Sequence, residues 1–343
     1  MNPVRGFWQE LYEKKISQGE PVFVVAPMAD VTDVAFREMI AKYSRMREVG
    51  GGPDVMWTEF VSATGLCSPG RDVLKRDLEF TDKQRPIVAQ LFTSNPDHMR
   101  EAARLCRELG FDGIDINMGC PDKSIEKQGA GAAHIKDWRT AQKVIRAAQE
   151  GAVDIPVSVK TRLGYNKIEY KEWLPKILEC NVPVLTVHLR TRKEMSKVAA
   201  HWEIMNDVRA LVREMTGEVQ DGGTILLGNG DVIDLIDGRN KAQETKIDGV
   251  MIGRGIFGTP WLFDSHTSGI TKSVEERLRI LVEHTRLYEE KLGDIKSFAI
   301  MKKHFKAYVN GFDGAKEFRS ELMECGNAKE VEDKVATFLS RDK

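Results

Sequence analysis

The chain has 343 residues, of which 41% are hydrophobic and 30% are charged, and its formal net charge is −1. This length allows one large α/β domain and a smaller one, with a core that needs neither disulfides nor a metal. The near-zero charge excludes a global attraction to nucleic acid, so binding of a polyanion requires a local basic patch. Five scattered cysteines without a CxxC pair, and seven histidines without zinc-ligand spacing, predict a reducing compartment and no metal site.

The first segment, residues 1–20, mixes charged residues into its apolar ones, as in Phe7–Lys15. This pattern predicts a helical extension and is not that of a signal peptide or a spanning helix. Later apolar runs are all shorter than the ~20 residues that a bilayer requires. We therefore expect a soluble, cytoplasmic protein with no membrane partner. The near-neutral charge, and the lack of an obvious apolar stripe outside the predicted core, make a monomer the expected state.

A regular series of short apolar runs follows the N-terminal segment. The runs are rich in Val, Ile and Leu and are more continuous than alternating, which is typical of strands covered on both faces of a parallel sheet. Eight predicted strands result: Val22–Met28, Asp54–Phe60, Pro86–Phe92, Gly113–Gly119, Pro156–Arg162, Val182–Leu189, Thr224–Gly230 and Gly249–Gly255.

Helical patterns lie between most of these strands. The clearest is Pro96–Leu109, which has one apolar face, a proline in its first turn and Ser94 or Asn95 as N-cap. The others are Thr32–Tyr43, Asp137–Glu150, Tyr170–Glu179, Trp202–Met215 and Val232–Arg239. Eight strands alternating with helices predict an α/β fold of the (β/α)8 TIM barrel type over residues 21–268. A doubly wound sheet is the alternative, but it more often has a GxGxxG motif after its first strand, where this chain has Ala29-Asp30-Val31.

The pattern becomes purely helical in residues 269–343, which predicts a C-terminal α-helical bundle domain. Its helices are expected at Val274–Lys291, Ile295–Gly311, Gly314–Cys325 and Ala328–Leu339. In the second of these, an inward-facing apolar face of Phe298, Met301, Phe305, Tyr308 and Phe312 places Lys296, Lys303 and Lys306 together on the opposite face. Such a lysine face is commonly only solvated, but residues 296–319 contain six basic residues and two acidic ones, which favours a surface for phosphates.

A parallel barrel builds its active site at the C-terminal ends of its strands. The polar or turn-forming residues at these ends are Pro27, Met28, Ala29, Gln90, Asn117, Cys120, Lys160, Arg162, His188 and Arg190. A lysine in a buried strand needs an anionic or hydrogen-bonding partner, which a phosphate-bearing cofactor would supply to Lys160. His188 can equally be a structural residue or a ligand contact.

The last two strands end in glycine-rich turns, Gly228-Asn229-Gly230-Asp231 and Gly253-Arg254-Gly255. Glycines let backbone N–H groups approach an anion closely, and Arg254 adds a positive charge. One such turn is commonly only a turn. Two of them at the seventh and eighth strands are typical of a phosphate site in this fold.

The fourth strand leads into Asp115-Ile116-Asn117-Met118-Gly119-Cys120-Pro121, which would hold one thiol at the strand tip. A lone cysteine is frequently a small buried hydrophobe. Polar neighbours and the Gly-rich turn at 128–132 place Cys120 in a loop zone instead of the middle of the core. From spacing alone, a structural and a functional thiol are equally good interpretations.

The motifs together resemble those of the flavin-dependent tRNA-dihydrouridine synthases over residues 22–325. The matching elements include Ala26–Asp33, Thr58–Ser62, Asn117–Pro121, Lys160–Gly164, Val187–Arg192, Gly228–Val232 and Ile252–Gly255, with Met301–His304 and Gly314–Glu317 in the C-terminal part. Asn-x-Gly-Cys-Pro is the specific element, whereas Pro-Met or Gly-Arg-Gly alone would suit other FMN-binding barrels.

The resemblance implies reduction of the C5–C6 double bond of particular uridines in tRNA by FMN, with NADPH or NADH as electron donor. Cys120 would then be the catalytic acid that protonates C5, a role that a thiol protonated at neutral pH can fill. The implied FMN-binding residues are Pro27, Met28, Ala29, Gln90, Lys160, His188, Asn229, Gly230, Asp231, Gly253 and Arg254. The expected substrate-binding residues are Asn117, Arg162 and Arg190 in the barrel and Lys296, Lys303 and Lys306 in the bundle.

Two other functions stay open at this point. An FMN-dependent barrel oxidoreductase acting on a small molecule would share the barrel motifs but would have no need of the C-terminal bundle. An RNA-binding protein with an inactive barrel would use the bundle but not Cys120. The sequence also leaves open the reduced uridine position, the role of Gly50-Gly51-Gly52, and whether His134 contacts substrate or only packs, as His134 and Trp138 stand where the family tends to have aliphatic residues or proline.

Overall fold

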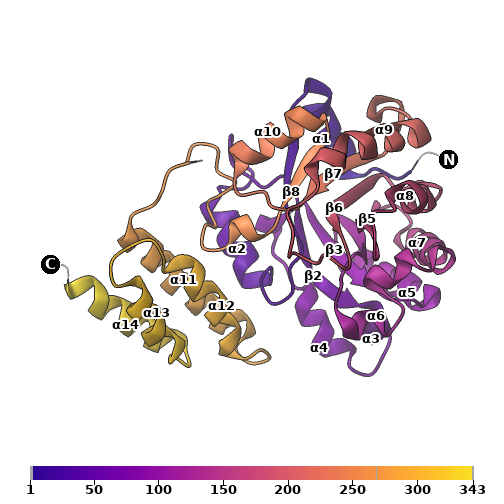
Figure 1. The fold of residues 1–343 in the computed structure, drawn as a ribbon. Helices are drawn as coiled ribbons and strands as arrows, with labels where there is room; N and C mark the ends of the chain where they lie inside the picture. The colour runs from indigo at the N-terminus through magenta and orange to yellow at the C-terminus, as the bar shows by residue number, and fades with distance from the viewer. Residues whose placement is uncertain (1–2, 268, 342–343) are drawn as a thin grey trace.

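The computed structural model describes residues 3–267 and 269–341, and its central feature is a ring of parallel strands (Figure 1). The predicted limits at residues 1, 268 and 343 lie outside the described part. The strands are β1 (Val22–Val25), β2 (Met56–Ser62), β3 (Ile87–Phe92), β4 (Gly113–Met118), β5 (Val157–Gly164), β6 (Val184–Thr191), β7 (Ile225–Asn229) and β8 (Gly249–Ile252).

The strands follow one another in the order β1-β8-β7-β6-β5-β4-β3-β2, and every pair is parallel. A bridge between Val24 and Val55, just before β2, brings the two outer strands together. The amide of Val25 donates to the carbonyl of Val55 at 3.2 Å. The predicted (β/α)8 fold is therefore confirmed, with strand bounds that differ by a few residues.

The inside of the barrel is closed at the end where the strands begin. Helix α1 (Phe7–Lys14) inserts Trp8, which is 1% exposed, into a cluster with Val22, Ile225 and Trp57. The Trp8 and Trp57 ring centroids lie 6.1 Å apart. Because large side chains fill this end, the opposite end, where the strands finish, is the one available for a site.

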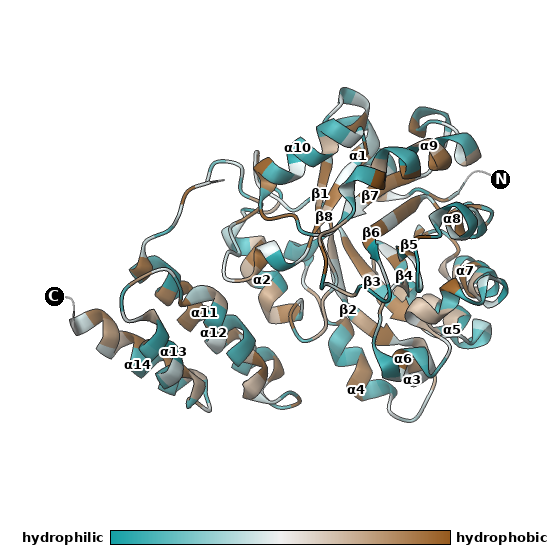
Figure 2. Ribbon diagram, in the orientation of Figure 1, coloured by the Kyte–Doolittle hydropathy of each residue, from teal (hydrophilic) through white to brown (hydrophobic). Residues whose placement is uncertain are grey.

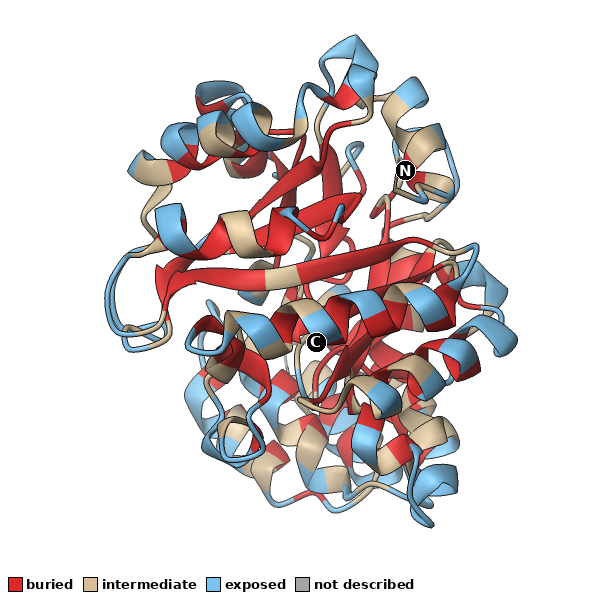
Figure 3. Ribbon diagram, turned by 90° about the vertical axis from the view of Figure 1, so that its right-hand side faces the viewer, coloured by how far each residue is buried: buried red, intermediate tan, exposed pale blue. Residues whose placement is uncertain are grey.

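Helices surround the ring and bury one face each against it (Figures 2 and 3). The main ones are α2 (Val34–Tyr43), α5 (Pro96–Glu108), α7 (Trp138–Ala152), α8 (Tyr170–Leu178), α9 (Met205–Thr216) and α10 (Leu235–Thr245). Helix α5 begins as predicted, with the Asn95 side chain accepting from the amides of Asp97 and His98 and with Pro96 in the first turn. Three short helices were not predicted, α3 (Ala63–Leu66), α4 (Arg71–Lys75) and α6 (Lys123–Glu126), because one helical turn leaves no periodic pattern.

The C-terminal helices form a bundle at one side of the barrel, next to α2 (Figure 1). They are α11 (Val274–Leu292), α12 (Lys302–Tyr308), α13 (Ala315–Met323) and α14 (Ala328–Arg341). A capping box between Ser273 and Glu276 fixes the start of α11.

The second bundle helix is shorter than the predicted Ile295–Gly311. A 3₁₀ turn, η8 (Phe298–Met301), precedes α12, and the Ser297 hydroxyl caps that turn by accepting from the amide of Ala299 at 3.3 Å. Lys296 therefore lies before the helical segment, and its predicted place on a common face with Lys303 and Lys306 is wrong. Of the predicted inward-facing residues, Met301, Phe305 and Tyr308 have no exposed surface, whereas Phe298 and Phe312 are half-buried against the core.

No helix in residues 3–267 and 269–341 combines the length and the apolar character needed to cross a membrane.

Candidate active site

A cavity of about 280 Å³ opens at the C-terminal ends of the strands. Most of the residues predicted from the strand ends line it: Pro27, Met28, Gln90, Asn117, Cys120, Lys160, Arg162, His188, Arg190, Asn229, Gly230, Asp231, Gly253 and Arg254. These residues meet in one cavity because the strand register places them side by side. Asn117 pairs with Lys160, Arg162 with His188, and His188 with Asn229 on successive strands.

The loop that carries Cys120 is held by the side chain of Asn117. Its Oδ1 accepts from the backbone amides of Gly119 at 3.1 Å and Cys120 at 2.9 Å. Its Nδ2 donates to Oε1 of Gln90 at 3.0 Å. Asn117 thus satisfies two amides of the turn while its own orientation is fixed by β3.

A buried network continues from Gln90 into the barrel. Gln90 Nε2 donates to Asp115 Oδ2 at 2.6 Å, and the Ser158 hydroxyl donates to Asp115 Oδ1 at 2.6 Å. Burial raises the pKa of Asp115 to about 6. The chain of contacts from Ser158 through Asp115, Gln90 and Asn117 sets the position of the thiol loop by side chains of three adjacent strands.

The Cys120 thiol lies in the cavity wall and is partly exposed. Burial raises its pKa above the ordinary thiol value, although the backbone amide of Asp122 and the cations Arg162 and Lys160 oppose this effect. The side chain is therefore a protonated thiol at neutral pH. A thiol in this state can donate a proton to a group held in the cavity.

Lys160 supplies a cation in the floor of the cavity. Its Nζ donates to Oδ1 of Asn229 at 3.0 Å, and Asn229 Nδ2 donates to the carbonyl of Met251 at 2.8 Å. Burial, followed by the nearby Arg162, lowers the pKa of Lys160 to about 8. An anionic or electron-rich ligand in the cavity would favour its charged form.

The two predicted arginines reach the cavity, but their nitrogens mainly bind the protein. Arg162 donates to the carbonyls of Gly119 (2.6 Å), Thr191 (3.2 Å) and Met195 (3.0 Å). Arg190 donates to the carbonyl of Val198 at 2.7 Å and pairs with Asp231. Both therefore hold loops around the cavity as well as lining it.

His188 is kept neutral. Arg190 Nη1 donates to its Nε2 at 3.1 Å, which makes that nitrogen the acceptor. Burial and the surrounding cations Arg162, Lys160, Arg190 and Arg254 lower its pKa well below the ordinary value. A neutral imidazole of fixed orientation is suited to contact a polar ligand without adding charge.

The turns after β7 and β8 form one rim of the cavity. Gly230 and Asp231 have consecutive positive φ angles, 130° and 50°. A Cβ on Gly230 would lie 2.8 Å from the Cβ of Ala200. The Asp231 carboxylate accepts from Arg254 at 2.7 Å and from the amide of Ala200 at 2.9 Å. A turn with two consecutive residues of positive φ, next to the largely exposed Arg254, fits a phosphate group.

Four predicted site residues lie outside the cavity lining: Ala29, Lys296, Lys303 and Lys306. Lys296 is paired with Glu59 (3.0 Å) and Asp77 (2.7 Å), and Lys303 with Asp30 (2.8 Å), all of them acidic residues of the barrel. Lys306 is exposed on α12. The three lysines therefore do not form one free surface.

Six further lining residues were not predicted: Ala26, Phe60, Gly119, Pro121, Ser196 and Val232. Phe60 lies near the end of β2, where the strand-end rule would have found it. Ser196 belongs to a long loop after β6, and its spacing carries no signal.

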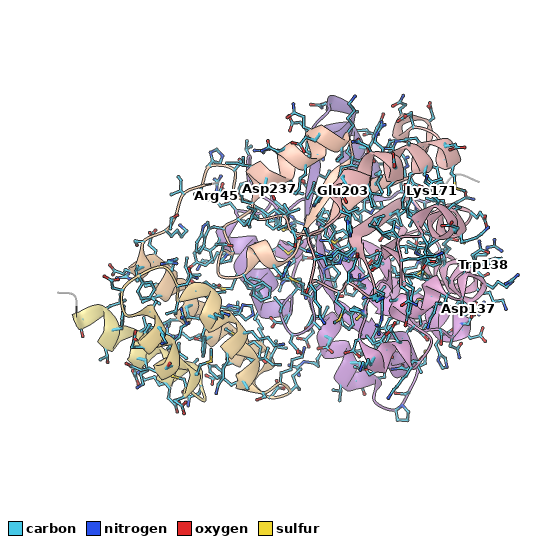
Figure 4. All side chains as sticks on the ribbon, viewed as in Figure 1. Arg45, Asp137, Trp138, Lys171, Glu203 and Asp237 are labelled. Carbon is cyan, nitrogen blue, oxygen red and sulfur yellow. The ribbon has the colours of Figure 1, made fainter. Side chains whose placement is uncertain are left out.

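His134 packs instead of lining the cavity. It is fully buried, its Nε2 lies 3.0 Å from the carbonyl of Thr93, and burial lowers its pKa to about 4. Trp138 lies on the outside of the barrel at the start of α7 (Figure 4), where Arg139 and Lys176 cover its ring.

The Gly50–Gly52 loop contacts the segment that leaves the barrel. The carbonyl of Gly50 accepts from the Ser265 amide at 2.8 Å. Nearby, Arg45, which is labelled in Figure 4, pairs with Asp264 at 3.0 Å. A Cβ on Gly51 would lie 1.9 Å from the carbonyl oxygen of Arg45, so this close approach requires glycine.

Comparison with protein families matches residues 24–342 to the model described as dihydrouridine synthase. Similar proteins include a "probable tRNA-dihydrouridine synthase 2" of Bacillus subtilis, 39% identical with 95% of this chain and 94% of the relative covered. Two "probable tRNA-dihydrouridine synthases" are also 39% identical, one from Staphylococcus epidermidis, with 94% of each chain covered, and one from Staphylococcus aureus, with 95% of this chain and 93% of the relative covered.

Among solved structures, a histamine dehydrogenase from Rhizobium sp. 4-9 matches with a TM-score of 0.50 at 12% identity, covering 77% of this chain and 48% of that one. A 6-hydroxypseudooxynicotine amine oxidase from Pseudomonas geniculata matches with a TM-score of 0.50 at 10% identity, covering 73% and 47%. At this identity the likeness concerns the fold alone.

Proposed function

Since the chain belongs to the dihydrouridine synthase family, we propose that it reduces the C5–C6 double bond of uridines in tRNA, with FMN as cofactor and NADPH or NADH as electron donor. The observation that carries this proposal is the position of the Cys120 thiol, in the wall of the same cavity as Lys160 and the glycine-rich rim, where burial raises its pKa.

The cavity fits FMN by its chemistry. The Gly230–Asp231 turn and Gly253–Arg254 would hold the phosphate, while Lys160 and His188 would face the polar edge of the ring. Pro27, Met28, Ala29, Gln90 and Asn229 complete the proposed binding set. When bound, FMN supplies the hydride for C6 and is recharged by NADPH or NADH.

Cys120 donates the proton that C5 receives. Its pKa, raised by burial, keeps the proton on sulfur until the base is in place. A uridine stacked in RNA cannot enter a cavity at a barrel end, so the base must leave its stack. Asn117, Arg162 and Arg190 surround the space next to the thiol and would contact the base or its ribose.

The bundle, with residues 269–343 as its proposed limits, binds the tRNA backbone. Lys306 is exposed on α12 and would contact a phosphate, a recognition by charge and shape in which sequence plays no part. We expect the protein to act as a monomer in the cytoplasm, where tRNA is available.

The experiment is to purify the protein, release its cofactor by denaturation and then incubate the holoenzyme with NADPH and tRNA that lacks dihydrouridine. A yellow protein that releases FMN, and new dihydrouridine at defined positions, are the expected results. A protein that cannot be reconstituted with FMN would contradict the proposal. A yellow protein that oxidises NADPH with small electrophilic alkenes but leaves tRNA unchanged would instead support the small-molecule oxidoreductase.

A further inference from the structure

The junction between bundle and barrel lies directly beside the cavity wall. Glu59, in β2, is 6% exposed and uses its two carboxylate oxygens in different directions. Oε1 accepts from the backbone amide of Asp30 at 2.5 Å, and Oε2 accepts from Lys296 Nζ at 3.0 Å. One carboxylate thus joins the loop after β1 to the bundle.

Lys296 is the cation of this junction, and its side chain is 18% exposed. It also pairs with Asp77 at 2.7 Å. Although burial opposes the charge, the ion pairs with Glu59 and Asp77 raise the pKa of Lys296 above the ordinary value. Burial and the neighbouring Glu59 raise the pKa of Asp33 to about 7. The two carboxylates of Glu59 and Asp77 therefore share one lysine, which they hold firmly.

The loop that Glu59 binds forms part of the cavity. Pro27 and Met28 line the cavity, and Asp30 follows two residues later with φ of 52°. A left-handed residue other than glycine costs roughly 1 kcal/mol and needs support from its surroundings. The bond from the Asp30 amide to Glu59 gives that support. The second contact to this loop, Lys303 with Asp30, is about half exposed and contributes little.

We propose that Lys296 is a positioning residue: it orients Glu59, Glu59 holds the Met28–Asp30 loop, and the docking of the bundle is thereby coupled to the shape of the FMN cavity. This inference rests on the proposed function for the identity of the cofactor. Lys296 thus supports the FMN cavity and does not bind a tRNA phosphate. Moving Lys296 to a phosphate would leave Glu59 and Asp77 buried or half-buried without their cation, which is costly.

The test measures FMN affinity of the apoprotein by quenching of flavin fluorescence, together with tRNA affinity over a range of salt concentrations. Lys296→Met and Glu59→Gln should each raise the Kd for FMN about tenfold, as expected for loss of a charged hydrogen bond. The double variant should bind FMN no more weakly than either single variant, because both substitutions break the same contact between Lys296 and Glu59. Lys296→Arg should retain FMN affinity near that of the wild type.

Lys306→Met is the matched control, since it removes a lysine of the adjacent helix that is exposed. It should leave FMN affinity unchanged. The slope of log Kd for tRNA against log salt concentration should fall by about one, because one phosphate contact is lost. The inference is overturned if Lys296→Met behaves like Lys306→Met, or if Glu59→Gln leaves FMN affinity unchanged. Glu59→Gln decides the matter if Lys296→Met does not fold. A wild-type chain that binds no FMN would overturn the proposed function, and this inference with it.

Discussion

The cavity and the junction with the bundle satisfy their polar groups in different ways. In the cavity, the partners come from strands one or two places apart in the barrel, as in Asn117–Gln90 on β4 and β3 and Lys160–Asn229 on β5 and β7. At the junction, the partners are far apart in the chain, and outside the buried Lys296–Glu59 pair their side chains are partly exposed, as in Lys42–Glu283 (2.6 Å) and Arg76–Asp294 (3.0 Å).

This difference has a consequence for rigidity. The hydrogen-bond ladder fixes the register of β3, β4 and β5, so the cavity side chains have one arrangement. Exposed ion pairs contribute about 0–1 kcal/mol each and can be exchanged for water or phosphate. The chemistry therefore lies on the rigid part, whereas the outer ion pairs of the junction can exchange while the buried Lys296–Glu59 pair stays in place.

The largest expected effect is the loss of the thiol. Cys120→Ala should lower the rate of dihydrouridine formation by about 10²–10⁴-fold, because a positioned proton donor is removed. FMN and tRNA affinity should stay within a few-fold of the wild type. Single-turnover reduction of tRNA measures the rate, and Cys67→Ala, which removes an exposed thiol outside the cavity, is the control. Equal rates for Cys120→Ala and Cys67→Ala would refute the role of Cys120.

A smaller effect is expected when the thiol stays but its loop loses its support. Asn117→Ala leaves the amides of Gly119 and Cys120 without their acceptor. We expect a 10–100-fold slower single turnover, since each unpaired buried group costs about 1–3 kcal/mol. The control is the same substitution at the asparagine that caps α14: Asn327→Ala should leave turnover unchanged. If both variants react at the wild-type rate, the loop does not depend on Asn117.

The same contrast explains what the sequence could predict. In a closed parallel barrel all strand ends meet at one rim, so reading the residues at those ends was sufficient to bring Cys120, Lys160 and His188 into one cavity. The link from Asp115 to Gln90 depends on the register between β3 and β4, which the spacing of residues along the chain does not contain.

For the bundle, the periodicity of apolar residues predicted the buried positions Met301, Phe305 and Tyr308. It did not predict which groups contact Lys296. A lysine face has the same sequence pattern whether solvent, RNA or a carboxylate covers it. The place of Lys296 was decided by the 3₁₀ turn that Ser297 caps and by the distant carboxylates of Glu59 and Asp77. Partners more than 200 residues earlier in the chain leave no local trace in the sequence.

A third prediction concerns the buried imidazole at the junction. His304 is fully buried against Phe36, His284 and Phe257, with ring centroids 4.8, 4.6 and 5.7 Å away. Within the described residues, neither of its ring nitrogens has a hydrogen-bond partner. Burial, and then the charge of Lys303, lowers its pKa to about 3.

The sign of the pH effect follows from this pKa. An unfolded histidine titrates near 6.5, so between pH 6.5 and 3 the unfolded chain binds more protons than the folded one, and stability falls as the pH falls. Between pH 8 and pH 5.5 the free energy of unfolding of the wild type should therefore fall by about 1–2 kcal/mol more than that of His304→Phe. Urea unfolding at both pH values measures this, with His98→Gln, at a partly exposed histidine, as control. Equal pH dependence in the wild type and His304→Phe would show that folding does not lower the pKa of His304.

The smallest effect tests the exposed part of the bundle. Lys306 lies on α12 with Lys303, but only Lys303 has a carboxylate partner, Asp30, among the described residues. Lys306→Met should weaken tRNA binding about threefold near 0.15 M salt, because one phosphate contact of the several made by a basic surface is lost. The slope of log Kd against log salt concentration should fall by about one. Lys329→Met, on α14 and paired with Asp333, should change neither quantity. If Lys306→Met leaves the slope unchanged while Lys303→Met lowers it, the RNA lies across the mouth of the cavity and displaces the Asp30 pair, and the junction is then part of the binding surface.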